Sequence, residues 1–286
     1  MKTFISILCK TLYSIMIMYI LFRQCLIISK EYKRNCIIYF INYSMSSVDC
    51  DIYNGNKKNT TEQPVYDSFN EFIFSSDIKV LGKLLHRHDF FNKTRHLPGD
   101  IVEVGVFKGS GVASFSKMIE IYCPNSIKKI VGFDIFDPEL SCEVLTKDTD
   151  VDKNSMNRVY SRVDKNDRTL NSVSNRLNNV SSSANFLLVE GDVEITLPKF
   201  IENNPGQRIS LLYIDVDIER PSYIALKYLW DKVVPGGIIV FDEYEYHKFT
   251  ESCGVDKFLK ERNIEYNLIT TNWLSPTCYI QKSKFL

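Results

Sequence analysis

Carboxylates stand at the points where apolar segments of this chain end, and this spacing is the feature that could do chemistry. Ile209–Ile214 is followed by Asp215, and Ile238–Phe241 is followed by Asp242 and Glu243. In an open parallel α/β sheet, the carboxyl ends of the strands meet at one edge, where ligands bind. Three carboxylates gathered there repel one another unless a cation lies among them, and oxygen ligands favour Mg²⁺ or a similar hard ion. Asp215, Asp242 and Glu243 are therefore predicted metal ligands.

Three glycines follow another short apolar segment, which itself contains an acidic residue near its end. Residues 101–104 include Glu103, and Gly105, Gly109 and Gly111 come after it. Glycines at a strand-to-helix turn let the backbone approach a nucleotide-type cofactor, and the N-terminus of the next helix offers free N–H groups. The spacing differs from the G-x-G-x-x-G of dinucleotide-binding turns. We predict that these four residues bind a cofactor.

A further carboxylate belongs to the same predicted site. Asp134 ends the segment 129–134, about thirty residues after the glycine turn, as a ribose-binding acid of an α/β fold should. An ionised carboxylate can accept hydrogen bonds from both ribose hydroxyls. Asp134 is therefore a predicted cofactor ligand.

The motifs stand in an order that resembles a known family. They are Leu97-Pro98-Gly99-Asp100-Ile101-Val102-Glu103-Val104-Gly105-Val106-Phe107-Lys108-Gly109, Gly132-Phe133-Asp134, Glu190-Gly191-Asp192, Ile214-Asp215-Val216-Asp217, and Pro235-Gly236-Gly237 through Asp242-Glu243-Tyr244. From about residue 75 to 282, the chain resembles the macrocin O-methyltransferase family of class I S-adenosylmethionine-dependent methyltransferases. The resemblance implies methyl transfer from S-adenosyl-L-methionine to a hydroxyl, often on a sugar, with a divalent cation, expected to be Mg²⁺, held by carboxylates.

The resemblance also assigns roles to individual residues. Glu103 would help to hold the cofactor, and Asp192 is a candidate for the adenine amino group. An aspartate just before Val193 fits the N-cap of a helix equally well. An alcohol is too weak an acid to ionise unaided, so the reaction needs a base. Asp215 would serve as base and metal ligand, and His247, five residues after Asp242, is the competing base.

Strand-like and helix-like segments alternate along the chain, which predicts a doubly wound, mostly parallel seven-stranded α/β sheet with helices on both faces. The Pro235-Gly236-Gly237 segment is read as a turn before a strand. Helices are expected over residues 75–88, 111–122, 193–202, 221–232 and 251–262, and closing strands over 264–269 and 277–281, the last antiparallel by analogy.

Residues 137–184 are rich in Asp, Asn, Ser and Lys and lack apolar periodicity. We expect an exposed loop region there, with a helix only over 170–177, and a lid or substrate loop fits its position equally well. Arg158, Arg162 and Arg168 lie in this region. They could clamp an anionic substrate such as a nucleotide sugar or be solvated surface residues.

The first 64 residues read as an extension of a methyltransferase domain over residues 65–286. Residues 1–45 hold six Lys or Arg against one acid, and residues 11–22 are almost wholly apolar. Twelve residues are short of the roughly 20 that a membrane span needs. A weak anchor, a disordered extension and a translation start at Met45 are three open alternatives. Residues 46–64 read as a polar linker.

Composition limits the partners and the compartment. The 286 residues carry a formal net charge of zero, which gives no basis for nucleic-acid binding. The eight cysteines form no C-x-x-C pair, as expected of a reducing compartment, and we expect a cytoplasmic protein whose catalytic domain needs no membrane. The expected partner is a small hydroxylated acceptor, a nucleotide sugar or a glycoside. Homo-oligomer formation stays open.

Two other functional classes share the expected fold. A nicotinamide-dependent oxidoreductase should show the dinucleotide-binding glycine spacing, which this chain lacks. A catalytically inactive binding protein with a methyltransferase fold would be expected to lose the carboxylate cluster, and this chain keeps it.

Overall fold

The computed structural model describes residues 63–180 and 185–283. The chain forms two units, Met1–Phe74 and Ser75–Leu286. The described part of the first unit is helix α3 (Gln63–Phe74), which has no buried residue. Among the helices described, none combines the length and apolar character needed to cross a membrane. The apolar stretch over 11–22 and the alternative start at Met45 lie outside the described residues.

The second unit is built on a seven-stranded sheet with the order β3-β2-β1-β4-β5-β7-β6. Neighbouring strands run parallel except at β7, which is antiparallel to both β5 and β6. The chain reverses its strand order around β1, and ligands of such sheets bind in the crevice at that point. The strands are β1 (Asp100–Val104), β2 (Lys129–Asp134), β3 (Asn185–Glu190), β4 (Ile209–Ile214), β5 (Val233–Phe241), β6 (Leu268–Thr270) and β7 (Cys278–Gln281).

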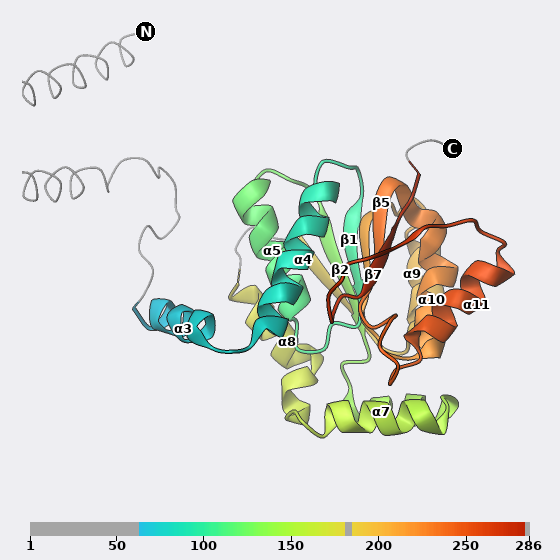
Figure 1. Cartoon of the computed structure of the whole chain (residues 1–286), viewed down its shortest axis with the longest axis horizontal. Coiled ribbons are helices and arrows are strands. Elements are labelled where there is room, and N and C mark those ends of the chain that lie inside the picture. Colours follow the sequence, from blue (N-terminus) through green and yellow to red (C-terminus); the bar gives the residue numbers. More distant parts are fainter. Residues whose placement is uncertain (1–62, 181–184, 284–286) are drawn as a thin grey trace, which may run out of the picture. The chain divides into compact units, whose positions relative to one another are not determined.

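Helices cover both faces of the sheet, which confirms the predicted doubly wound fold (Figure 1). One layer contains α4 (Ile78–Thr94), α5 (Ser110–Tyr122) and α8 (Leu170–Asn178), and the other contains α9 (Val193–Asn203), α10 (Glu219–Leu229) and α11 (Glu251–Glu261).

Successive side chains of the central strands are buried in different cores, one on each face of the sheet, because side chains alternate between the two faces of a strand. Ile101 packs with Phe115 in the core on the α4–α5 face, and Val102 packs with Leu226 in the core on the opposite face. Glu103 follows Ile101 by two residues and therefore points to the α4 side of the sheet.

The segment after β2 is largely helical, so the expectation of an exposed loop region there was wrong. It contains α6 (Pro138–Val144), η1 (Leu145–Lys147), α7 (Asp150–Tyr160) and η2 (Lys165–Arg168) before α8.

Local capping explains two of these helices. The side chains of Asp137 and Thr149 accept backbone N–H groups at the starts of α6 and α7, as helix N-caps do. A small cluster of Leu145, Met156 and Ile218 packs this segment onto the rest of the unit. Because so few side chains of this segment are buried, its sequence shows no extended apolar periodicity from which the helices could have been predicted.

The Pro235-Gly236-Gly237 segment is also different from its prediction, because it lies inside β5 and is not a separate turn. The register between β4 and β5 shifts between Ile209 and Leu211, as at a β-bulge. Gly236 has a φ of 82°, a backbone conformation that glycine adopts readily. The strand therefore absorbs the irregularity without ending.

We predict that residues 75–286 fold without the preceding residues, because both large cores consist of side chains from this unit. The thermal midpoint of this fragment should lie within about 4 °C of the full chain, which corresponds to roughly 1 kcal/mol for a domain of this size. Circular dichroism with a thermal scan measures it. A fragment that lacks a cooperative transition would show that the first unit is needed for folding.

Candidate active site

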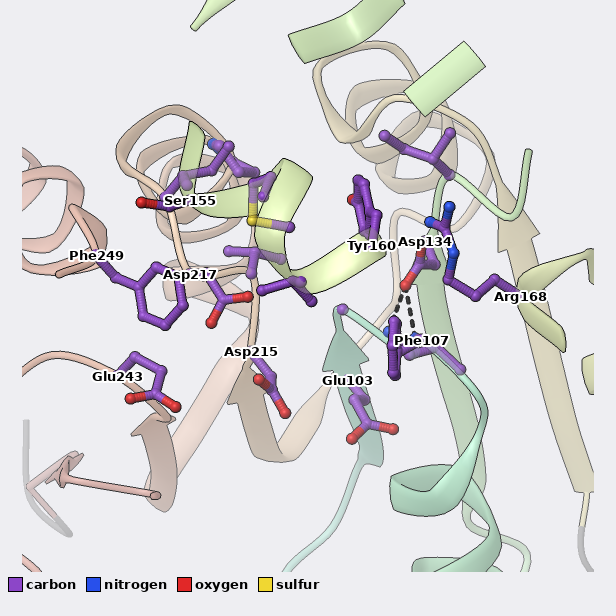
Figure 2. A pocket seen from close by; sticks show the side chains of 18 of the residues that line it. Glu103, Phe107, Asp134, Ser155, Tyr160, Arg168, Asp215, Asp217, Glu243 and Phe249 are labelled. Atoms are coloured by element: carbon purple, nitrogen blue, oxygen red, sulfur yellow. Dashed lines mark hydrogen bonds between the residues drawn. The ribbon is translucent and has the colours of Figure 1, made fainter. Parts of the chain in front are cut away.

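A cavity of about 910 Å³ lies at the carboxyl ends of β1, β2 and β4. Residues of α7 and the α4 helix also line it. Figure 2 shows Asp134 on one side of this cavity, Asp217 and Glu243 on the other, and Glu103 and Asp215 between them. The sequence-predicted residues that line it are Glu103, Gly105, Asp134, Asp192, Asp215 and Glu243.

Two of the predicted glycines provide space where other groups approach closely. A Cβ on Gly105 would lie 1.8 Å from the backbone oxygen of Asp215, and Gly105 has a φ of 95°. A Cβ on Gly111 would lie 1.8 Å from Oε1 of Glu103. Gly109, with a φ of 91°, is the N-cap residue of α5. These glycines bring the strand ends and the Glu103 carboxylate together, and their contact with a cofactor stays a prediction.

Asp134 organises the glycine turn. Its Oδ2 accepts the backbone N–H groups of Val106 at 2.8 Å and Phe107 at 2.7 Å (dashed lines in Figure 2). Phe107 has a φ of 53°, which is uncommon for a residue with a side chain. The Asp134 carboxylate therefore stabilises this conformation through one oxygen, and its predicted contact with ribose would use the other.

Asp192 is the N-cap residue of α9, which is one of the two roles that the sequence analysis considered for it. Its side chain accepts the N–H of Glu194 at 3.0 Å at the start of α9. Lys147 lies 3.0 Å and Arg220 3.3 Å from its Oδ2. Burial alone would raise the pKa of Asp192, but these hydrogen bonds and charges lower it. A role toward adenine stays a prediction.

Helix α4 contributes three basic residues that the sequence analysis did not single out. Lys79, Lys83 and Arg87 are four residues apart and so lie on one face of the helix. We call them the basic stripe. The Nζ of Lys83 lies 2.8 Å from Oδ2 of Asp215 and 2.8 Å from Oδ2 of Asp242. The four-residue spacing was a visible signal, but it does not reveal which strands the helix faces.

The other two members of the basic stripe also face strand-end carboxylates. Arg87 Nη2 lies 2.8 Å from Oε1 of Glu103, and Lys79 Nζ lies 3.8 Å from Oε1 of Glu243. The guanidinium of Arg87 also lies over the ring of Tyr213, 4.7 Å from its centroid. Three successive turns of one helix thus contact the ends of β1, β4 and β5.

Burial controls the charge of Glu103. It raises the pKa of this carboxyl to about 7, although the neighbouring Arg87 acts in the opposite direction. Oε2 of Glu103 is buried and has no hydrogen-bond partner among the described residues. An acceptor atom without a partner beside the cavity is suited to an N–H donor of a bound ligand.

The carboxylates near the end of β4 are also shifted by burial. Burial and the nearby Asp242 raise the pKa of Asp215. Burial and Asp215 raise the pKa of Asp217 well above its ordinary value. The sequence analysis quoted Asp217 within a motif but gave it no role, and the structure places it in the cavity lining with a φ of 65°. Burial together with Asp242 raises the pKa of Glu243 to about 7.

The predicted metal site is not confirmed. Within residues 63–180 and 185–283, no three His, Cys, Asp or Glu side chains are grouped so that they could hold a metal ion. The side chain of Asp242 is 1% exposed, and Lys83 occupies the position between Asp242 and Asp215. Burial lowers the pKa of Lys83, but the charges of Asp215 and Asp242 outweigh this effect and raise it. The ammonium of Lys83 therefore stays charged at neutral pH. The donor set, as arranged, does not fit a metal ion.

The two candidate bases lie in different environments. Asp215 lines the cavity. His247 is exposed on the loop between β5 and α11, with its ring 5.4 Å from that of Tyr246, and it is absent from the lining residues of the described chain. The geometry therefore favours Asp215.

The three arginines considered in the sequence analysis line the cavity. Arg168 is buried, and its guanidinium carbon lies 3.9 Å above the Tyr160 ring (Figure 2). Arg158 and Arg162 are exposed residues of the wall. Basic side chains are therefore available at the rim of the acidic cavity.

The strand order and the position of the cavity are those of the class I methyltransferase fold. The chain belongs to the macrocin O-methyltransferase family: the family model described as Macrocin-O-methyltransferase (TylF) matches residues 87–281. It is therefore an S-adenosylmethionine-dependent O-methyltransferase. No curated protein matches the chain in sequence.

Two solved structures show the likeness of the fold. The calicheamicin methyltransferase CalS11 is 23% identical with a TM-score of 0.58, and the match covers 78% of this chain and 87% of that one. The O-methyltransferase NovP is 20% identical with a TM-score of 0.55, covering 70% of this chain and 79% of that one. At these identities the likeness supports the fold.

We predict that Arg87→Met lowers the free energy of unfolding by about 3–5 kcal/mol, because it leaves the buried Glu103 carboxylate without its partner. The double variant Arg87→Met/Glu103→Gln should recover part of the loss. Urea unfolding at pH 8 measures both. Lys93→Met on the same helix removes an exposed pair with Asp89 and should cost less than about 1 kcal/mol. Equal costs for Arg87→Met and Lys93→Met would contradict a structural role of the buried pair.

Proposed function

We propose that this methyltransferase acts on a hydroxyl of a small, sugar-containing acceptor, a nucleotide sugar or a glycoside. The observation that carries the proposal is the position of Asp215. Its carboxylate lines the same cavity as Glu103 and Asp134 and is held through Oδ2 by Lys83. A cofactor bound beside Glu103 and Asp134 would bring its methyl group toward a base that is already oriented.

The cofactor half of the cavity would comprise the glycine turn and two carboxylates. Glu103 Oε2 offers an unused acceptor for the ammonium group of the methionine part. Asp134 Oδ1 would accept hydrogen bonds from the ribose hydroxyls, while Oδ2 holds the turn. Asp192 lines the cavity on this side and would lie near the adenine. These residues fit S-adenosylmethionine because they supply acceptors for its cationic and hydroxyl groups.

The acceptor half would comprise Asp217, Glu243 and the polar wall of α7. Carboxylates form strong hydrogen bonds with hydroxyl groups, which suits a sugar. The exposed Arg158 and Arg162 could contact the phosphates of a nucleotide sugar. A solved structure of CalS11, 22% identical, is described as a TDP-rhamnose 3'-O-methyltransferase, and this supports an acceptor of that class.

The chemistry then needs only one proton acceptor in the chain. As the hydroxyl oxygen attacks the methyl carbon in line with the sulfur, the carbon–sulfur bond breaks and the hydroxyl proton passes to Asp215. Burial raises the pKa of Asp215, which makes the ionised carboxylate a stronger base than an exposed aspartate. Lys83 holds Oδ2, so Oδ1 is the atom that would take the proton.

The resemblance to the family implied a divalent cation, which would acidify the acceptor hydroxyl. Asp215, Asp242 and Glu243 are the residues that would hold it. Lys83 lies between the first two, and the three carboxylates do not form a metal-binding group in the described chain. No step of the proposed reaction therefore passes through a metal ion.

We predict that S-adenosylhomocysteine binds the purified protein and that Asp134→Ala weakens binding by roughly 1.5–3 kcal/mol, because charged hydrogen bonds are lost. Glu190→Gln is the matched control. Glu190 is the register partner of Asp134 at the end of β3, but it is exposed and is not among the cavity-lining residues described. Titration calorimetry distinguishes the two variants. Binding of NADH without binding of S-adenosylhomocysteine would overturn the cofactor assignment.

We predict that Asp215→Asn lowers kcat by about 10²–10⁴, because an amide cannot accept the proton in the transition state. Binding of S-adenosylhomocysteine should be nearly unchanged. Glu243→Gln removes a neighbouring cavity carboxylate and should have a smaller effect, and His247→Ala should change kcat only a few-fold. Turnover of sugar acceptors measured by mass spectrometry tests this.

Two other outcomes of that experiment are informative. Loss of turnover in His247→Ala with turnover kept in Asp215→Asn would move the base to His247. Cofactor binding by the wild type without turnover of any nucleotide sugar or glycoside would favour the alternative of an inactive binding protein.

A further inference from the structure

Lys83 occupies the place in the acidic site where a cation was expected from the sequence. Its ammonium lies 2.8 Å from one oxygen each of Asp215 and Asp242, a normal length for a charge-assisted hydrogen bond. Lys83 belongs to α4, and Asp215 and Asp242 directly follow β4 and β5, so this contact connects one helix to two strand ends. The two carboxylates thereby share a positive charge that belongs to the chain itself.

The chain itself already uses three of the about four acceptor positions of the Asp242 carboxylate. Oδ1 accepts the hydroxyl hydrogen of Tyr213 at 2.6 Å, and Oδ2 accepts from Lys83 and from the hydroxyl of Ser275. Its side chain is 1% exposed. A metal ion bound between Oδ2 of Asp215 and Oδ2 of Asp242 would have to displace the Lys83 ammonium, which lies 2.8 Å from both atoms. Mg²⁺ requires carboxylate oxygens at about 2.0–2.1 Å in a near-octahedral arrangement.

The surroundings of α4 hold Lys83 in this position. One turn further on, Arg87 is buried and paired with Glu103. A Cβ on the preceding Gly82 would lie 2.2 Å from the ring of Trp273, so the helix packs directly against this residue. Ser275, which donates to Asp242, follows Trp273 by two residues. The helix and the Asp242 carboxylate are therefore positioned by the same loop.

We propose that Lys83 is the resident cation of this active site: it replaces a divalent metal ion between Asp215 and Asp242 and orients Asp215 for its role as base. Lys83 is a positioning residue, since it acts through Asp215. The inference rests on the proposed function for the role of Asp215. The exclusion of metal by Lys83 does not depend on any acceptor.

Metal binding tests the inference without an acceptor. The full chain, saturated with S-adenosylhomocysteine, is titrated with Mn²⁺ and followed by electron paramagnetic resonance. The wild type should bind no stoichiometric Mn²⁺ at concentrations that saturate Lys83→Met. The variant should bind one Mn²⁺ about tenfold or more tightly than the wild type, because Asp215 and Asp242 then lack their shared counterion.

Two further variants separate charge from packing. Lys83→Arg keeps the positive charge and should bind no stoichiometric Mn²⁺. Lys79→Met removes a charge one turn earlier on the same face, where the side chain is 54% exposed. Like the wild type, this variant should bind no stoichiometric Mn²⁺. If Lys83→Met does not fold, Lys83→Gln takes its place, since it removes the charge but can still donate a hydrogen bond.

Each result decides the inference. Stoichiometric Mn²⁺ binding by the wild type would overturn it, and so would the absence of binding in both the wild type and the uncharged variant. A gain of binding confined to the Lys83→Met or Lys83→Gln protein supports it. Failure of the proposed acceptor class would appear separately, as absent turnover with the metal titrations unchanged.

Discussion

The pairing of the basic stripe of α4 with carboxylates at the strand ends is the interaction on which the site depends. Glu103, Asp215 and Asp242 lie together at the edge of the sheet, where removal from water makes their negative charge costly. Lys83 and Arg87 offset this cost because they are placed one helical turn apart. Opening such a pair leaves an uncompensated buried charge, so the helix position and the site geometry are coupled.

The glycines of the first turn serve this same arrangement. Gly111 leaves room for the Glu103 carboxylate, and Gly105 lets the end of β1 approach the backbone at Asp215. A side chain at either position would displace the carboxylate or separate the two strand ends. The glycine pattern that predicted cofactor binding is thus also required by the close packing of the acidic residues themselves.

The carboxyl ends of the five parallel strands, which form the edge that carries the site, were predictable, because each of their apolar runs ends in or next to an acidic residue. β4 has the predicted bounds, and its carboxylate Asp215 lies in the cavity as expected. Contacts between distant segments were not predictable in this way. The pairing of Lys83 with Asp242 joins residues 159 positions apart, and nothing local in the sequence indicates it. The helices α6 and α7 were missed because capping side chains start them and few buried residues mark them.

The identity of the cation next to a base affects how strong that base can be. A nearby positive charge favours the ionised form of a carboxylate and so lowers its pKa. A carboxylate with a lower pKa is a weaker base. For Asp215, burial and the neighbouring Asp242 raise the pKa, and Lys83 and Arg87 lower it, with a net rise. A single ammonium charge opposes protonation less than a doubly charged ion at the same place would. In the proposed reaction, Lys83 would therefore orient the carboxylate through Oδ2 and leave Oδ1 as the proton acceptor.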